Sequence, residues 1–88
     1  MLFEKSRRSE SEVIYDILTY AKTQLKKTRL MYLSNMPYNH FNKYLDLLLE
    51  KELIEKIETN PEGSLYFTTE KGNNYLQSMD YIFKLLKN

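Results

Sequence analysis

The spacing of apolar residues along this chain is helical except over residues 53–68, where a strand pattern replaces it. Pro61 and Gly63 lie within this segment, and the residues that follow, Leu65-Tyr66-Phe67-Thr68, are strand formers. The pattern predicts a β-hairpin over 53–68 with a loop of five or six residues. Because helical patterns flank it on both sides, we expect a mainly α, α+β fold with one two-stranded hairpin.

Helical signals are clear at the start of the chain. Ser9 can cap a helix over 9–22, and Glu12 can reach back to the amide of Ser9. The helix has one apolar stripe, predicted to be buried, that consists of Val13, Ile14, Ile17, Leu18 and Ala21.

Two further helices are predicted before the hairpin. After a basic connector over 22–27, Thr28 can cap a short helix over 28–35. Pro37 suits the first turn of the next helix, over 37–51, because its missing N–H would have no partner there. The apolar side of that helix carries Phe41, Tyr44, Leu45 and Leu48. Two helices joined by a tight turn make a helix-turn-helix candidate.

A long helix is predicted over 69–87, with Thr69 as its cap. Its apolar stripe either packs on its own domain or forms a seam with a second subunit, and we expect the seam because a small monomer seldom leaves so much apolar surface exposed. The expected dimer-interface residues are Tyr75, Leu76, Met79, Ile82, Phe83 and Leu86. Tyr66 and Tyr81 are expected to contribute to the same interface.

Composition excludes several classes of function. The chain has 88 residues, which suits a single domain over 1–88, and it has no cysteine and one histidine, His40. Thiolate sites and disulfides are therefore excluded, and metal and triad chemistry lack partners for His40. Neither glycine belongs to a phosphate-binding motif. We expect no enzyme, no cofactor, no metal and no small-molecule substrate. No apolar run is long enough to span a membrane, so we expect no membrane partner and a cytoplasmic location.

The net charge of +1 hides an uneven distribution. Residues 1–43 contain eight cations and four acids, for a net charge of +4, whereas residues 44–88 contain five cations and eight acids, for −3. The hairpin tip over 58–64 has two acids and no cation. The basic half contains the helix-turn-helix candidate.

Several blocks of the sequence resemble a known family. The chain carries Lys27-Thr28-Arg29-Leu30-Met31-Tyr32, Asn35-Met36-Pro37-Tyr38, Tyr44-Leu45, Leu53-Ile54 and Thr69-Glu70-Lys71-Gly72. These blocks resemble small archaeal winged helix-turn-helix DNA-binding proteins, in particular the chromatin-type proteins that dimerise through a C-terminal antiparallel coiled coil. The resemblance covers residues 9–86.

The resemblance implies a homodimer that binds double-stranded DNA without a cofactor and is associated with the nucleoid. The hairpin would be the wing, 37–51 the recognition helix and 69–87 the dimerisation helix. Two features differ from the family pattern: Pro37 stands where a capping hydroxyl is common, and the wing is acidic. An acidic wing is poorly suited to bind phosphates.

The expected DNA-binding residues form two groups. Residues at the start of the recognition helix would meet base edges: Tyr38, Asn39, His40, Asn42 and Lys43. A basic cluster before and within the second helix, Lys26, Lys27 and Arg29, would contact phosphates. Arg7 and Arg8 would add a basic arm. The competing interpretations are a solvated helix face and an ordinary basic loop.

Two functions are compatible with these patterns. The first is a homodimeric DNA-binding protein that acts as a transcriptional regulator or a chromatin-associated protein. The second is a winged-helix protein–protein interaction module whose acidic wing and C-terminal helix bind another protein. Salt-dependent binding of duplex DNA distinguishes the two, since phosphate contacts weaken steeply as salt rises.

Overall fold

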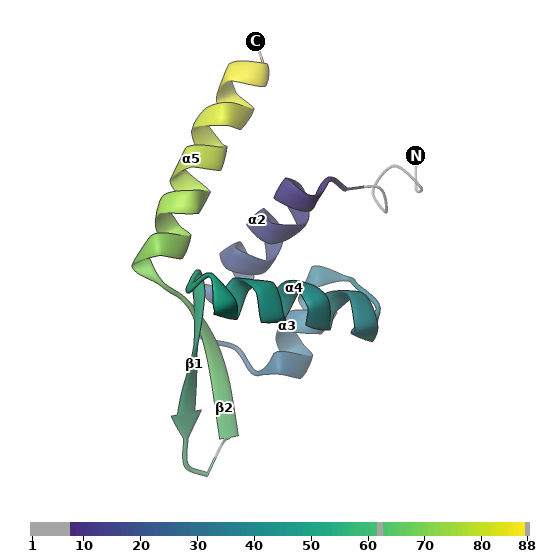
Figure 1. The fold of residues 1–88 in the computed structure, drawn as a ribbon, viewed down its shortest axis with the longest axis vertical. Coiled ribbons are helices and arrows are strands. Elements are labelled where there is room, and N and C mark those ends of the chain that lie inside the picture. The colour runs from purple at the N-terminus through teal and green to yellow at the C-terminus, as the bar shows by residue number, and fades with distance from the viewer. Residues whose placement is uncertain (1–7, 62, 88) are drawn as a thin grey trace.

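The computed structural model describes residues 8–61 and 63–87. The mainly α fold with one hairpin and a long C-terminal helix is confirmed, with boundaries within about a residue of those expected (Figure 1). The elements in chain order are α2 (Glu10–Ala21), α3 (Lys27–Ser34), α4 (Tyr38–Glu50), β1 (Ile54–Thr59), β2 (Gly63–Thr68) and α5 (Glu70–Leu86).

The start of α2 forms as expected. The Glu12 amide donates to the Ser9 hydroxyl at 3.2 Å, and the Ser9 amide donates to the Glu12 carboxylate at 2.9 Å. This reciprocal pair satisfies two N–H groups that the first turn would otherwise leave free. Of the predicted stripe, all but the partly buried Ile14 are buried.

The start of α3 differs from the prediction. Thr28 lies inside the first turn rather than at the cap, and Lys26 occupies the N-cap position with no side-chain hydrogen bond. The reason is a short bridge: Leu25 exchanges two backbone hydrogen bonds with Tyr66, at 3.1 and 2.8 Å. This pairing keeps the chain extended up to Lys26, so the helix begins directly after it. Pro37 likewise lies at the N-cap of α4, one position before the first turn.

The hairpin loop is shorter than the predicted five or six residues. Strands β1 and β2 pair antiparallel with Ile54 opposite Thr68 and Thr59 opposite Gly63, which leaves three residues between the last pair. The Thr59 hydroxyl donates to the Gly63 carbonyl, and Gly63 has a φ of 90°. A glycine allows this backbone conformation without steric cost.

The core lies between the helices and one face of the hairpin. It consists of Val13, Ile17, Leu18, Ala21, Leu30, Phe41, Leu45, Leu48, Ile54, Tyr66 and Leu76. Tyr66 and Leu76 are only 7% and 5% exposed. The expectation that these two side chains belong to a dimer seam was therefore wrong, because both belong to the domain's own core.

Helix α5 leaves the other elements and extends beyond them (Figure 1). One side of it is tied to α2: the Tyr75 hydroxyl donates to the Ser11 carbonyl at 3.2 Å, and the Tyr15 hydroxyl donates to the Asp80 carboxylate. The Tyr15 and Phe83 rings meet edge to face at 5.3 Å. Beyond Phe83 the apolar side chains Leu85 and Leu86 are 62% and 79% exposed. Within the described part of the chain, no helix has the length and apolarity needed to cross a membrane.

Candidate nucleic-acid interface

The first turns of α3 and α4 meet at one point on the surface. The ammonium nitrogen of Lys27 lies 5.6 Å from the centre of the Tyr38 ring, within the range of a cation–π contact. Buried Leu30 and Phe41 fix the two helices against the core behind this contact. Tyr38 is 61% exposed, so its ring is also accessible to a ligand. The structure thus brings together two residues that the sequence predicted as separate parts of one site.

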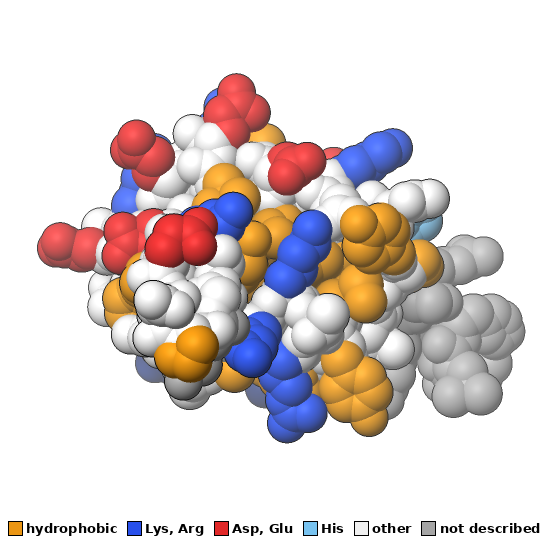
Figure 2. Space-filling model, turned by 90° about the horizontal axis from the view of Figure 1, so that it is seen from below, with side chains coloured by type: hydrophobic (Ala, Val, Ile, Leu, Met, Phe, Trp, Pro, Cys, Tyr) orange, Lys and Arg blue, Asp and Glu red, His pale blue; other side chains and the backbone are white. Residues whose placement is uncertain are grey.

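Basic side chains on this face lack acidic partners. Within residues 8–61 and 63–87, the salt bridges are Arg8–Asp16 and Lys56–Glu58, so the cations of α3 and α4 form none. The cations of α3 and α4 are Lys27, Arg29 and Lys43, and Lys26 at the N-cap of α3 adds a fourth. Figure 2 shows several Lys and Arg side chains in a band down the middle of the face seen from below, with Asp and Glu side chains at the left and along the top of this view. This is the charge distribution expected of an anion-binding face.

The two helices of this face also differ from the others at their N-termini. Side chains of Ser9 and Thr69 cap α2 and α5, whereas the N-caps of α3 and α4, Lys26 and Pro37, make no side-chain hydrogen bond. The first N–H groups of both helices therefore remain available to water or to an external acceptor. Phosphate oxygens are suitable acceptors at such positions.

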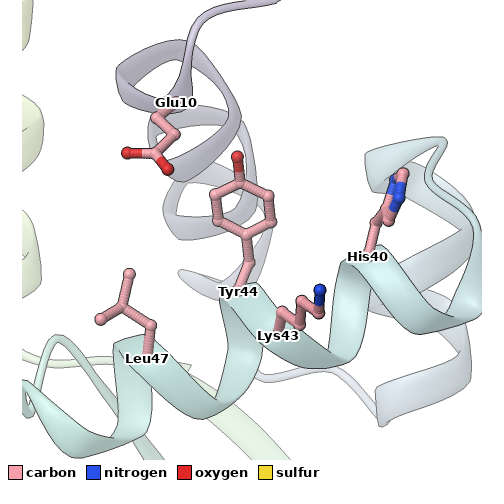
Figure 3. A pocket seen from close by; sticks show the side chains of 5 residues that line it. All are labelled: Glu10, His40, Lys43, Tyr44 and Leu47. Atoms are coloured by element: carbon pink, nitrogen blue, oxygen red, sulfur yellow. The ribbon is translucent and has the colours of Figure 1, made fainter.

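One flank of α4 faces α2 across a hollow of about 330 Å³. Figure 3 shows Tyr44 rising from α4 toward α2 and Glu10 projecting from α2 into the same space. His40, Lys43 and Leu47 complete the lining. His40 therefore lies on the α2 side of the helix, apart from the contact between Lys27 and Tyr38. An acid at this position opposes an approaching phosphate.

Comparison with known proteins fits this arrangement of helices and hairpin. The pattern of the winged helix-turn-helix family matches residues 7–87. The chain belongs to this family. The predicted resemblance is confirmed, and the hairpin β1–β2 is the wing of this fold.

Two solved structures share the fold. Sso10a-2, a DNA-binding protein from Sulfolobus solfataricus, has a TM-score of 0.79 and 27% identity, with 92% of this chain and 84% of that chain covered. A winged-helix DNA-binding protein from STIV has a TM-score of 0.68 and 23% identity, with 82% and 84% covered, and shows the fold alone.

Two uncharacterized proteins of Methanocaldococcus jannaschii are related in sequence. They are 32% and 33% identical to this chain over 81 residues, which is 91% of the chain. The chain spans 36% of the length of the first and 78% of the second. The match to the first is therefore a match to one part of a longer protein.

Sequence reasoning missed one exposed aromatic residue of α3, Tyr32, which lies beside Arg29. Tyr32 is 72% exposed, and the guanidinium carbon of Arg29 lies 5.9 Å from the centre of its ring. Beside it, a hollow of about 410 Å³ is lined by Met31, Tyr32, Asn35, Met36 and Pro37. The helical spacing of Tyr32, opposite the buried Leu30, was the available signal, because it indicates an exposed aromatic ring.

Arg8, which was expected to belong to a basic arm that contacts DNA, binds other parts of the chain instead. Its guanidinium pairs with Asp16 and donates to the Ser34 carbonyl at 2.9 Å. Arg8 thus joins α2 to the end of α3, and its charge is compensated. Arg7 lies outside the described residues.

The wing carries acidic side chains. The Glu58 side chain is 72% exposed, and the ammonium nitrogen of Lys56 lies 3.6 Å from its carboxylate oxygen. The hydroxyl of Ser64 donates to Glu58 at 2.9 Å. The wing therefore offers no net positive charge to a phosphate backbone. No group of three or more metal-ligating side chains comes together among the described residues.

Proposed function

We propose that this winged-helix protein binds double-stranded DNA through the face formed by the starts of α3 and α4. The observation that carries the proposal is the contact of Lys27 with Tyr38, which joins both helix starts beside cations that have no acidic partner among the described residues. Duplex binding depends on such cations because each phosphate contact releases counterions.

The two groups of side chains have different roles in this proposal. Lys26, Lys27 and Arg29 contact phosphates and set the position of the protein on the duplex. Asn39, Asn42 and Lys43 face base edges in the major groove, where asparagine can pair with adenine and lysine with guanine. Tyr38 lies between the groups, and its hydroxyl contacts a phosphate. His40, which lines the hollow facing α2, contributes least.

The family neighbours support the proposal, since Sso10a-2 is a DNA-binding protein with the same fold over 92% of this chain. The acidic wing argues for modest affinity per subunit, because the wing adds repulsion rather than a second phosphate contact. We propose a regulatory or chromatin-associated role at the nucleoid, as a consequence of DNA binding.

A fluorescent duplex titrated at two salt concentrations tests the proposal. The expected result is an affinity that falls steeply as salt rises. Lys27→Ala and Arg29→Ala should each weaken binding and lower the slope of log K against log salt by about 1. Lys84→Ala, on α5, removes the same charge away from the face and should leave the slope unchanged. Absence of duplex binding at low salt would overturn the proposal and favour a protein-interaction role for the acidic wing.

We also propose that the protein forms a homodimer through the exposed face at the C-terminal end of α5. The apolar side chains on that face are Tyr81, Ile82, Leu85 and Leu86, which are 64%, 43%, 62% and 79% exposed. Met79 and Phe83 are partly buried along the same helix, and Tyr75 packs against the core. A second copy of α5 would remove this apolar strip from water.

Light scattering measures the proposed dimer directly. Leu86→Asp should shift the protein from dimer to monomer, because it puts a charge into an apolar seam without touching the core. Gln77→Asp adds the same charge at another exposed position of α5 and should leave the dimer intact. A monomeric wild-type protein at tens of micromolar, or a dimer unaffected by Leu86→Asp, would contradict the proposal.

A further inference from the structure

The duplex contacts proposed above do not use the exposed Tyr32 or the hollow beside it. Tyr32 is 72% exposed, the most exposed aromatic side chain among those described, and it stands at the end of α3, where the chain turns toward α4. A paired base inside a duplex presents only its edges to a protein, because its faces are stacked on neighbouring bases. A free aromatic ring face instead suits an unpaired base.

The surroundings of Tyr32 combine three kinds of contact. Met31, Met36 and Pro37 give the hollow apolar walls. Asn35 supplies an amide: its backbone N–H bonds to Met31 and Tyr32 carbonyls at 3.1 Å, while its side chain makes no hydrogen bond within the described part of the chain. An amide carries both donors and an acceptor, which is what the edge of a nucleobase requires.

Charge on this surface favours a polyanion. Arg29 lies over the Tyr32 ring at 5.9 Å, and Lys27 lies over the Tyr38 ring at 5.6 Å, so each exposed ring has its own cation. No Asp or Glu occurs in residues 17–45, which include all of α3 and the turn that follows it. Aromatic rings alternating with cations are typical of surfaces that bind single-stranded nucleic acid.

We propose that the turn between α3 and α4 binds an unpaired nucleobase of single-stranded DNA or RNA. The base stacks on the Tyr32 ring in the hollow, the Asn35 amide hydrogen-bonds to its edge, and Arg29 contacts the adjacent phosphate. Tyr38 with Lys27 provides a second ring and cation for a neighbouring nucleotide.

The experiment measures binding of a short fluorescent oligothymidylate to the full chain. Tyr32→Ala should weaken binding by about tenfold or more, in keeping with the measured strength of base–aromatic stacking. Tyr32→Phe keeps the ring and should retain affinity. Tyr20→Ala, which removes a 36% exposed tyrosine on α2, serves as the matched control and should have no effect. Tyr32 is largely exposed and Tyr20 is partly exposed, so circular dichroism should show all three variants folded.

A second arm changes the ligand instead of the protein. An abasic strand of equal length keeps every phosphate but has no base to stack, so it should bind the wild-type protein as weakly as oligothymidylate binds Tyr32→Ala. An oligouridylate of the same length identifies the source: equal or tighter binding that also depends on Tyr32 supports RNA as a ligand. Binding confined to oligothymidylate supports single-stranded DNA.

Two results would overturn the inference. One is an affinity for oligothymidylate that Tyr32→Ala leaves unchanged, and the other is equal binding of the abasic and complete strands. Both would mean that phosphates alone hold the strand. The duplex titration is independent of this outcome, because Tyr32→Ala should change duplex affinity by less than about twofold if duplex binding depends chiefly on phosphate contacts.

Discussion

The first turn of α5 rests directly on the start of the wing, where Gly72 lies against the backbone carbonyl of Leu53. A Cβ on Gly72 would be in steric conflict with that carbonyl oxygen and would come within 2.6 Å of Thr68 Cγ2. The same carbonyl accepts the Thr69 amide at 3.1 Å. The Leu53 backbone therefore cannot move away without loss of this hydrogen bond.

Gly72→Ala should lower the free energy of unfolding by about 1–3 kcal/mol, the usual cost of overpacking. Alanine is otherwise the better helix former, so the loss would be opposite in sign to the helix propensity. Urea denaturation measures the change. Asn74→Ala, at an exposed position in the same helix, is the control and should be neutral or slightly stabilising. Equal stability of Gly72→Ala and wild type would contradict this contact.

Thr68→Val tests a buried hydrogen bond between the wing and α2. The Thr68 hydroxyl donates to the Leu18 carbonyl at 2.6 Å, and both residues are buried. In a regular α-helix the Lys22 amide would donate to the Leu18 carbonyl, but here it donates to the Thr19 carbonyl instead. The Thr68 hydroxyl therefore supplies the donor for the Leu18 carbonyl. Valine has the same shape and no donor, and the expected loss is about 1–3 kcal/mol.

Thermal unfolding measures that loss, with Thr68→Ser as the comparison. Serine retains the donor and removes only a methyl group, so it should be more stable than Thr68→Val if the hydrogen bond matters more. The opposite order would mean that the methyl contact dominates at this position.

Much of the fold could be predicted because its signals are local. The capping box of Ser9 with Glu12, the Thr69 cap and the apolar stripes of α2 and α4 each depend on residues a few positions apart. The start of α3 could not be predicted in this way, because it depends on a bridge from Leu25 to Tyr66, far away in the chain. For the same reason Tyr66 and Leu76 resembled surface residues of a seam.

The candidate site could be predicted in composition but not in geometry. Residue types and charge identified the starts of α3 and α4, yet only the structure shows that Lys27 reaches Tyr38 and that His40 and Glu10 line the same hollow. The compensation of Arg8 by Asp16 also depends on a contact between side chains eight positions apart, one of them outside α2. Side-chain pairing across helices is a tertiary property, which sequence spacing does not specify.

The pH dependence of stability at alkaline pH should depend on Tyr15. Its hydrogen bond to Asp80 raises the pKa of Tyr15 above the ordinary value of about 10. The neutral form is thus favoured in the folded protein. Its contribution is complete below the unfolded pKa and is lost as pH rises through the folded pKa.

Denaturant titrations at neutral pH and above pH 10 measure this loss. Tyr15→Phe should make stability fall less steeply above about pH 10, because phenylalanine keeps the ring contact with Phe83 and has no proton to lose. Burial also raises the pKa of Tyr75, so some dependence should remain in this variant. An unchanged slope in Tyr15→Phe would show that Tyr15 is not the group responsible.

Glu10→Gln should strengthen duplex binding. Glu10 lines the hollow with His40 and Lys43, and its carboxylate would repel a phosphate that approaches this flank of α4. The amide has nearly the same shape without the charge, so affinity at low salt should rise by about two- to fivefold, given the modest energies of exposed charges. Glu70→Gln, at the start of α5, removes the same charge elsewhere and should change affinity less. Equal effects of both variants would indicate a dependence on net charge alone.

Lys26→Ser should separate stability from DNA binding. Lys26 has the extended backbone of an N-cap, with φ −68° and ψ 156°, but no side-chain hydrogen bond. Serine at this position can accept the amide of Thr28 or Arg29, which should raise the free energy of unfolding by about 0.5–2 kcal/mol. The same change removes one cation and occupies an N–H group available to phosphate, so duplex affinity should fall. Denaturation and duplex titration of one sample measure both effects. Lys22→Ser, at the C-cap of α2, is the control and should not raise stability. A variant with weaker DNA binding and no gain in stability would show that the start of α3 does not accept a cap.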